Sequence, residues 1–356
     1  MTFLRNAWYA AAWAADVPVD APVSRTLLGQ NLVLFRGEDG SVGAFPDRCP
    51  HRYAPLSLGR VEAGRLVCGY HGLTFDNAGR CTGSPLSQKA PPNTQLEPLP
   101  VVERHRMVWV WMGHAALADT ALVPEFTFLD SADMPIVTGM TAMKADYRLS
   151  IDNLMDLSHI EFVHTGTFGG RGIIKDSVYE VVEAPDGIEA RWTMNDIPPP
   201  RAGLGADRVD HWLHMRWQAP ASLLLEVGYK PAGAGDQSSR RDFQAHILTP
   251  TTGVSSLYFW AAHARIAAKP GDPHDPDRND LRTAFDVEDK PMIEAVQRNI
   301  GNRDLFENKL AFLPYDRGAV RVRQRLQALI AQEQDDESSG DVVGDAARRS
   351  TLSGER

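Results

Sequence analysis

The sequence has few cysteines, no excess of basic residues and no long apolar run. Only three cysteines occur in 356 residues, so a disulfide framework is excluded and a reducing compartment, the cytoplasm, is expected. The formal net charge is −9, and the lysines and arginines do not form a basic stripe, which argues against a nucleic-acid partner. No stretch approaches twenty apolar residues, so no membrane span is expected.

Two cysteines and two histidines occur in matched pairs near the N-terminus. Cys49 and His51 form C-x-H, and Cys68 and His71 form C-x-x-H. Two thiolates on one iron and two imidazoles on the other are the ligand set of a Rieske [2Fe-2S] cluster. A Cys2His2 zinc site uses the same ligand types, but zinc fingers pair Cys with Cys and His with His along the chain. The mixed pairs therefore favour the iron-sulfur cluster.

A second group of metal-binding residue types lies in the middle of the chain. Asn153, Asp156, His159 and His164 follow one another in a segment with a mostly helical apolar pattern. Five residues of helix place His164 about 140° from His159, so the two imidazoles share one metal only if the helix is distorted. Alternatively, either histidine is a hydrogen-bonded core residue.

A Rieske cluster carries one electron and has no open coordination position, so a second redox site is expected. Two histidines and one carboxylate form the facial triad of non-heme Fe(II), which leaves positions open for O2 and substrate. The carboxylate should come from another element. The residues alone leave four candidates, Asp286, Glu288, Asp289 and Glu294.

The strand and helix patterns predict an α+β protein with two domains and a tail. Short β-rich runs between turn residues over 1–115 predict an antiparallel β domain that carries the cluster loops. Over 116–330 we expect a catalytic domain in which helices flank a larger antiparallel sheet. Residues 331–356 are rich in Asp, Ser, Gly and Arg, which predicts a disordered tail.

The motifs resemble those of the oxygenase components of Rieske non-heme iron oxygenases, in the vanillate and dicamba O-demethylase group. The resemblance covers residues 1 to about 330 and includes CPHRYAPLSLG, CGYHGL, DYRLSIDNLMDLSHIEFVH, APASLLLEVG and EDKPMIEAVQ. It implies that His159, His164 and Asp289 bind mononuclear Fe(II), that Asp156 bridges the metal sites and that Asn153 lies near the iron. His246 matches a substrate-contacting histidine of the dicamba enzyme; alternatively, it is a strand histidine that faces solvent.

The resemblance also implies a homotrimer in which the cluster of one chain reduces the iron of its neighbour. Asp156 would then lie between His71 of one chain and His159 of the next. The chain has no G-x-G-x-x-G motif, so electrons are expected from a separate NAD(P)H-dependent reductase or ferredoxin.

The expected activity is that of a monooxygenase in aromatic compound catabolism. It uses O2 to demethylate a methoxybenzoate such as vanillate, giving a phenol and formaldehyde. Ring or methyl hydroxylation and N-demethylation are alternatives on the same scaffold. A Rieske electron carrier is an alternative of another class, but it needs only about a hundred residues, and the two-histidine motif would have no role in it.

Overall fold

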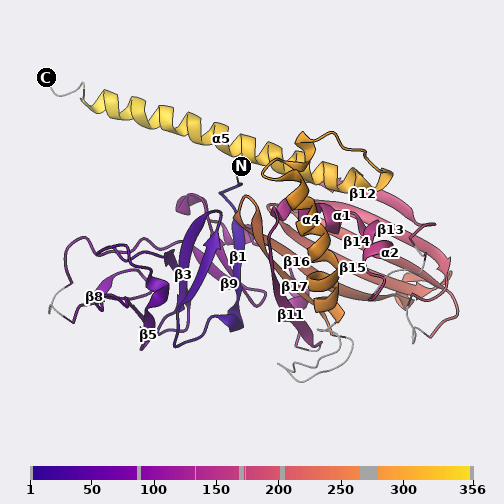
Figure 1. Ribbon diagram of the computed structural model, residues 1–356, viewed down its shortest axis with the longest axis horizontal. Helices are drawn as coiled ribbons and strands as arrows, with labels where there is room; N and C mark the ends of the chain where they lie inside the picture. The colour runs from indigo at the N-terminus through magenta and orange to yellow at the C-terminus, as the bar shows by residue number, and fades with distance from the viewer. Residues whose placement is uncertain are drawn as a thin grey trace.

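The computed structural model describes residues 3–85, 90–132, 134–167, 172, 174–200, 205–264 and 280–352. Small antiparallel sheets form one end of the molecule, and a large antiparallel sheet with helices forms the other (Figure 1). The predicted α+β class and the order of the two regions are confirmed. No described helix has the length and apolar character that crossing a membrane requires.

The N-terminal region contains three small antiparallel sheets. Apolar runs separated by turn residues form them, as in the hairpin of β3 and β4, where Gly40 adopts a φ of +82°. The sheets are β1 (Trp8–Trp13), β10 (Met107–Trp111) and β9 (Val101–Arg104); β2 (Val23–Leu27), β3 (Gln30–Arg36) and β4 (Val42–Pro46); and β5 (Arg60–Glu62), β6 (Arg65–Val67), β7 (Thr74–Phe75) and β8 (Cys81–Gly83).

The second region is built on a seven-stranded antiparallel sheet. Strand β14 alternates between buried and half-buried residues, because successive side chains point to opposite faces, whereas β16 and β17 contain continuous buried runs. In spatial order the strands are β11 (Ile136–Met143), β17 (Ser255–His263), β16 (Arg240–Thr252), β15 (Ser222–Pro231), β14 (Val209–Gln218), β13 (Gly187–Ile197) and β12 (Val178–Ala184).

The two faces of β16 and β17 pack against different parts of the chain. Ala245, Ile247, Phe259 and Ala261 lie on one face and share a buried cluster with the aromatic strands β1 and β10. That cluster includes four buried tryptophans, Trp8, Trp13, Trp109 and Trp111. The other face packs against the helices. The large sheet therefore joins the N-terminal region to the helical layer.

The helical layer contains two helices with irregular backbone. The long helix predicted around the histidine motif is broken at Asp156 (φ −113°, ψ 89°) into α1 (Tyr147–Met155), the 3-10 turn η6 (Leu157–His159) and α2 (Ile160–Val163). The π-helical segment η8 (Thr283–Asp289) continues directly into α4 (Lys290–Ile300). The other short turns are η1 (Ala14–Asp16), η2 (Leu56–Leu58), η3 (Ala115–Leu117), η4 (Thr120–Leu122), η5 (Thr127–Asp130), η7 (Asp236–Ser238), η9 (Leu305–Glu307) and η10 (Pro314–Asp316).

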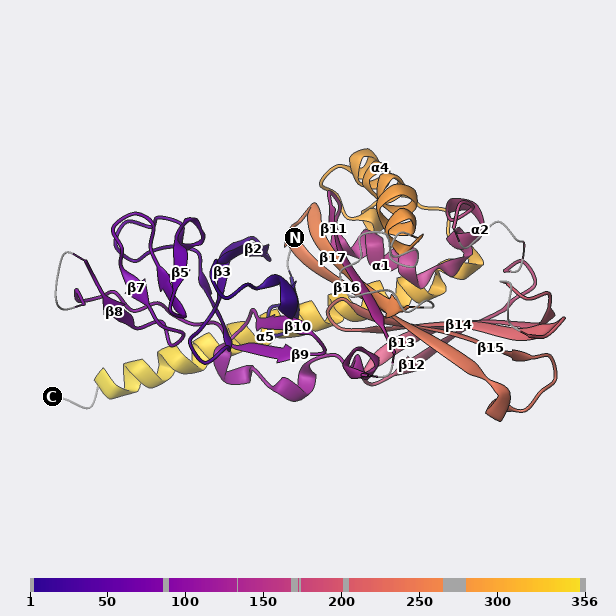
Figure 2. The same ribbon diagram turned by 90° about the horizontal axis from the view of Figure 1, so that it is seen from below.

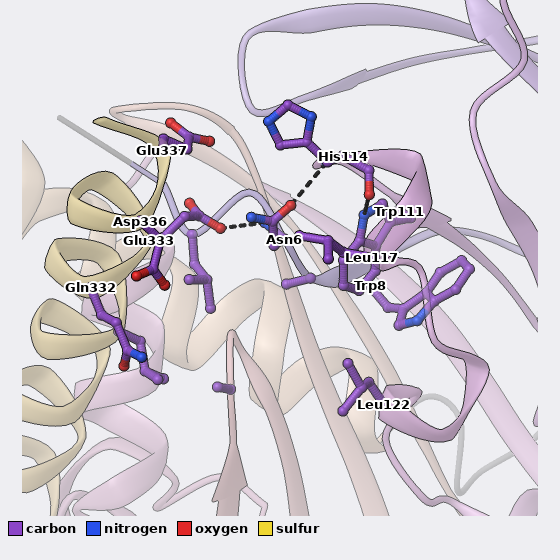
Figure 3. A pocket seen from close by; sticks show the side chains of 14 residues that line it. Asn6, Trp8, Trp111, His114, Leu117, Leu122, Gln332, Glu333, Asp336 and Glu337 are labelled. Atoms are coloured by element: carbon purple, nitrogen blue, oxygen red, sulfur yellow. Dashed lines mark hydrogen bonds between the residues drawn. The ribbon is translucent and has the colours of Figure 1, made fainter. Parts of the chain in front are cut away.

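The last helix, α5 (Arg317–Leu352), runs past both regions (Figures 1 and 2). It extends through most of the segment 331–356, which differs from the disordered tail expected there. The buried Glu333 carboxylate accepts hydrogen bonds from the backbone N–H groups of Arg5 (2.7 Å) and Asn6 (2.5 Å). Beside this contact lies a cavity of about 850 Å³ that is lined by none of the expected metal ligands (Figure 3). The domain boundaries at 115 and 330 stay a prediction.

Candidate metal centres and cavity

The four residues predicted to bind the cluster lie on two loops of similar shape. The Cys49 N–H donates to the Ala54 carbonyl oxygen and the Cys68 N–H to the Leu73 carbonyl oxygen, both at 2.8 Å. The fourth residue after each cysteine, Tyr53 or Gly72, has a positive φ that turns the chain back. The two loops therefore present their cysteine and histidine side chains together at one end of the small sheets.

In the folded chain the two cysteines are neighbours and the two histidines are neighbours. Along the sequence, by contrast, each motif contains one cysteine and one histidine. The Cys49 and Cys68 thiols are buried neighbours, and burial together with Cys68 raises the pKa of Cys49 to about 11. The His51 and His71 rings are 4.6 Å apart, and both are at least partly exposed. No three of the four residues bring ligand atoms within 4.8 Å of one another in the described ranges. One zinc ion would need such convergence, whereas separate thiolate and imidazole pairs fit a two-iron cluster.

A second group converges on one point in the helical layer. Ligand atoms of His159, His164 and Asp289 all lie within 4.8 Å of one another, and no other three such residues in the described part of the chain do so. His159 Nε2 is 3.6 Å from Asp289 Oδ1, and His164 Nε2 is 3.3 Å from Asp289 Oδ2. Two imidazoles and a carboxylate with this spacing can hold a ferrous ion.

The break at Asp156 explains how both histidines reach this point. The Asp156 carboxylate accepts a hydrogen bond from the Ser158 N–H (3.0 Å), which starts the turn η6. The Asp156 backbone carbonyl oxygen accepts the Nδ1–H of His159 at 2.5 Å. Nε2 of His159 therefore faces Asp289. Because the chain turns between α1 and α2, the two imidazole rings come within 5.1 Å.

Glu288 orients the second histidine. Its carboxylate accepts Nδ1–H of His164 (2.8 Å), the hydroxyl of Thr167 (2.7 Å) and the N–H of Gly166 (3.2 Å). A Cβ at Gly166 would lie 2.7 Å from Glu288 Oε1, so a side chain there would displace the carboxylate. Carboxylates that hold metal-binding histidines in this way fix the tautomer and raise the basicity of the ligand.

The net pKa shifts of the two imidazoles are opposite, although the neighbouring carboxylates raise both pKa values. Burial lowers the pKa of His159, although the Asp289 carboxylate opposes this effect. Burial also disfavours protonated His164, but hydrogen bonds and charges from Asp289 and Glu288 outweigh it and raise the pKa of His164. The paired carboxylates therefore make this pocket favourable for a cation.

Of the four carboxylate candidates, the structure brings Asp289 to the histidines. Asp286 instead accepts a hydrogen bond from the Thr141 hydroxyl (2.5 Å), and Glu294 accepts one from the Lys144 N–H (2.9 Å). Asn153 Nδ2 donates to Asp289 Oδ1 at 3.3 Å. Spacing did not reveal the orienting role of Glu288, because the Glu288 carboxylate approaches His164 through tertiary structure. Its position next to Asp289 was the available signal.

The three residues open into a cavity of about 230 Å³ between the helical layer and the large sheet. Apolar side chains form most of its walls, including Leu154, Leu157, Leu213, Met215, Leu225, Val227 and Phe285. Polar groups include His211, Asp242, Gln244 and His263, and no lysine or arginine lines it among the described residues. The cavity has the size and character of a site for a small aromatic molecule.

His246 lines the same cavity from strand β16. It is buried, and its Nδ1 lies 2.6 Å from the hydroxyl oxygen of Tyr258. Burial lowers the pKa of His246 to about 3. The imidazole is therefore neutral near pH 7, and the solvent-facing position weighed as an alternative for His246 is wrong.

The chain matches two protein families that together span both regions. Residues 7–102 match the Rieske [2Fe-2S] domain, and residues 143–332 match the vanillate O-demethylase oxygenase C-terminal domain.

Individual relatives are similar over nearly the whole chain. The oxygenase component of chloroacetanilide N-alkylformylase from Rhizorhabdus wittichii is 37% identical, with 93% of this chain and 97% of the relative covered. The vanillate O-demethylase oxygenase subunit of a Pseudomonas species is 34% identical, with coverage of 94% and 96%. The structure is also similar to the crystal structure of dicamba monooxygenase bound to dicamba, with a TM-score of 0.84 and 32% sequence identity. The match covers 94% of this chain and 100% of the dicamba monooxygenase chain.

Proposed function

We propose a function from one premise: the chain belongs to the Rieske non-heme iron oxygenases, in the family of the vanillate O-demethylase oxygenase components. It is an oxygenase component of a Rieske monooxygenase, and its cofactors are a Rieske [2Fe-2S] cluster and mononuclear iron. The proposal concerns the residues that hold these cofactors, the substrate and the assembly.

We assign the cluster to Cys49, Cys68, His51 and His71, and the ferrous ion to His159, His164 and Asp289. The observation that carries the second assignment is the convergence of three ligand atoms within 4.8 Å at the edge of an enclosed cavity. Asn153 supports Asp289 through a hydrogen bond of 3.3 Å. The pairing of thiols with thiols and imidazoles with imidazoles supports the first assignment.

When bound, the cluster supplies electrons one at a time and the ferrous ion supplies the position at which O2 is activated. The apolar walls exclude water and hold an aromatic ring against His159 and His164. For a methoxy substrate, one oxygen atom enters a methyl C–H bond and the other leaves as water, with two electrons and two protons supplied. The resulting hemiacetal breaks down to a phenol and formaldehyde.

A methoxybenzoate is the substrate we propose first. Support comes from the similarity to vanillate O-demethylase and to dicamba O-demethylase, the latter at 33% identity. A cavity of about 230 Å³ with mostly apolar walls suits one substituted benzene ring.

Removal of an N-alkyl group from an anilide is a second candidate reaction. The 37% identity to the chloroacetanilide N-alkylformylase component favours it. So does the lack of lysine and arginine among the described lining residues, because a buried carboxylate without a cationic partner is costly. An anilide places a neutral carbonyl oxygen in the cavity and avoids this cost.

A trimer and a separate reductase complete the proposal. The proposed cluster ligands belong to the N-terminal region and the proposed iron ligands to the helical layer, and these two parts form opposite ends of the molecule (Figure 2). A groove of about 350 Å³ beside Asp156 and His159 has Met292 and Phe312 on its rim, both more than half exposed. Exposed apolar residues, Tyr53, Leu58 and Tyr70, surround the cluster loops. Contact between this groove and the cluster loops of a neighbouring chain would cover both surfaces, and would place Asp156 beside His71 of that neighbour.

The experiment is a turnover assay of the reconstituted enzyme with a compatible reductase, NADH and O2. The substrates are a panel of methoxybenzoates and N-alkyl chloroacetanilides, and the products are a phenol with formaldehyde or a dealkylated anilide. Release of formaldehyde from a methoxybenzoate supports the first proposal, and dealkylation of anilides alone supports the second. Formation of a ring diol alone would contradict both.

A further inference from the structure

The hydroxyl of Tyr258 is the hydrogen-bond partner of His246 in the wall of the cavity. Nδ1 of His246 lies 2.6 Å from this hydroxyl, and both side chains are buried. Nε2 of His246 is also buried and has no hydrogen-bond partner among the described residues. Because His246 lines the cavity, this unpaired nitrogen is the part of the ring available to a ligand.

The numbers of hydrogen-bond donors and acceptors in the pair favour one tautomer of His246. A neutral imidazole carries one N–H, and a tyrosine hydroxyl carries one hydrogen. If Nδ1 carried the proton and donated it to Tyr258, the tyrosine hydrogen and the Nε2 lone pair would both be buried without partners. If Tyr258 donates to Nδ1, only the N–H of Nε2 remains unpaired. Unpaired buried groups are costly, so the second arrangement is favoured.

The surroundings of the pair hold this geometry. The Phe285 ring packs against the His246 ring (5.7 Å between centroids) and against the Tyr258 ring (5.2 Å). Trp260 also packs on Phe285, and its indole N–H donates to Thr141. His246 and Tyr258 lie on adjacent strands β16 and β17. Neither ring can therefore turn away without disturbing several buried aromatic residues.

We propose that Tyr258 is a positioning residue that holds the proton of His246 on Nε2, so that the cavity offers a neutral hydrogen-bond donor and selects substrates with a carbonyl or carboxylate oxygen. This inference rests on the proposed function for the reaction, but it concerns ligand binding and not turnover. An acceptor oxygen on the ligand would pair with the buried Nε2–H and remove the cost of leaving this donor unpaired. A donor group on the ligand would leave the Nε2–H unpaired. Tyr258 itself is not among the residues that line the cavity.

The test measures binding to the intact protein by calorimetry under anaerobic conditions without reductant. The probes are 3-methoxyacetophenone, 3-methoxybenzoate, 3-methoxyaniline and anisole, which carry a neutral acceptor, an anionic acceptor, a donor and no second polar group. The wild type should bind at least one acceptor probe more tightly than anisole. Tyr258→Phe should reduce this preference about three- to tenfold, which is the range for one hydrogen bond. The two acceptor probes separate a neutral carbonyl from a carboxylate.

A double-mutant comparison separates the effect of the proton from an effect of packing. In a His246→Ala background, Tyr258→Phe should not change the preference further, because its target is gone. Tyr147→Phe is the matched control, because it removes a buried tyrosine hydroxyl that has no hydrogen-bond partner among the described residues and lies outside the cavity. An unchanged far-UV circular dichroism spectrum and an unchanged midpoint of thermal unfolding show that each variant is folded.

Three results would overturn the inference: a Tyr258→Phe protein that binds acceptors like the wild type, an equal loss in the His246→Ala background, or a wild-type preference for 3-methoxyaniline. These results are independent of formaldehyde release. The protein could therefore keep its preference for acceptor probes but release no formaldehyde, which would contradict only the proposed reaction. It could also release formaldehyde without that preference, which would contradict only this inference.

Discussion

Glu288 and the Asp156 carbonyl determine, at the residue scale, which nitrogen of each histidine faces Asp289. Both accept an Nδ1–H, at 2.8 Å for His164 and 2.5 Å for His159. The sequence predicted the two imidazoles from their residue type and spacing. It could not predict these acceptors, because a backbone carbonyl has no sequence signature and Glu288 reaches His164 only through the tertiary fold.

We expect Glu288→Gln to weaken binding of the mononuclear iron about ten- to a hundredfold, the usual effect of losing a carboxylate behind a metal-binding histidine. The neutral amide loses the charge that favours a cation, and its NH2 group cannot accept the Gly166 N–H. Titration of the iron-depleted protein with Fe(II) measures the change. Glu294→Gln is the control, because that carboxylate contacts the Lys144 N–H away from the iron site. Equal iron affinity in Glu288→Gln and the wild type would contradict this role.

Asp289→Ala should remove the mononuclear iron and leave the cluster intact. Analysis should then give two irons per chain instead of three, with an unchanged visible spectrum and no turnover. The reason is that Asp289 supplies the one carboxylate of the three converging ligands, and the cluster loops lie in a different region. Loss of the cluster spectrum in this variant would show that the two sites are assigned to the wrong residues.

Binding of 3-methoxyacetophenone should not depend on the protonation of His246 between pH 5 and 9. Burial lowers the pKa of His246 to about 3, so the group is neutral throughout this range and acquires a proton only below it. Calorimetric titrations at several pH values measure this. A loss of affinity centred near pH 6.5, which disappears in His246→Ala, would mean that His246 has an ordinary pKa.

At the scale of elements, regular patterns were predictable and their interruptions were not. Runs rich in aromatic and β-branched residues predicted the strands of the large sheet, and the helical pattern predicted the segment of His159 and His164. That segment is interrupted at Asp156, and the helix that carries Asp289 contains π-helical turns. Both irregularities are found where the proposed site residues converge. The local sequence favours a regular helix there, and tertiary packing overrides that preference.

A buried ion pair ties α5 to α1 and supplies a test at this scale. Two guanidinium N–H groups of Arg323 donate to the Asp152 carboxylate at 3.0 and 2.5 Å, and the Arg323 side chain is only 6% exposed. Arg323→Ala leaves the carboxylate without its partner, and should lower the apparent free energy of unfolding by about 3 kcal/mol. Urea denaturation monitored by fluorescence measures the loss.

Arg321→Ala on the same helix is the matched control. Arg321 pairs with Glu183 at 3.3 Å, but both side chains are about half exposed. Exposed pairs contribute little, so the expected loss is below about 1 kcal/mol. Equal losses in the two variants would show that the burial of the Arg323 pair has no special effect on stability.

For the whole molecule, the proposed trimer predicts that two inactive chains complement each other. Cys68→Ser removes the cluster and His164→Ala removes the mononuclear iron, so neither protein alone should turn over. In a co-expressed mixture, a chain with an intact cluster can reduce a neighbour with intact iron. With random assembly in equal amounts, about a quarter of the directional interfaces in a ring are productive. Activity near that fraction of the wild type is expected, and no recovered activity in isolated mixed oligomers would contradict electron transfer between chains.

The sequence predicted the order of the two regions, but not how closely they are joined. The motifs that identified each region contain its proposed metal ligands and are local in sequence. The buried contact between Trp8, Trp109 and the strands β16 and β17 involves residues more than 130 positions apart. The extent of α5 was also unexpected, because its composition beyond residue 335 is typical of disorder, whereas Glu333 anchors the helix to the N-terminus.

The shared tryptophan cluster has a consequence for biosynthesis. During translation the four tryptophans leave the ribosome early. Ala261 helps to cover their indole rings but is made about 150 residues after Trp111. At typical elongation speeds this delay lasts roughly 8 to 30 s. The nascent chain therefore exposes the apolar surface of these tryptophans for that time. Chaperone capacity should then limit the yield of folded enzyme in a foreign host.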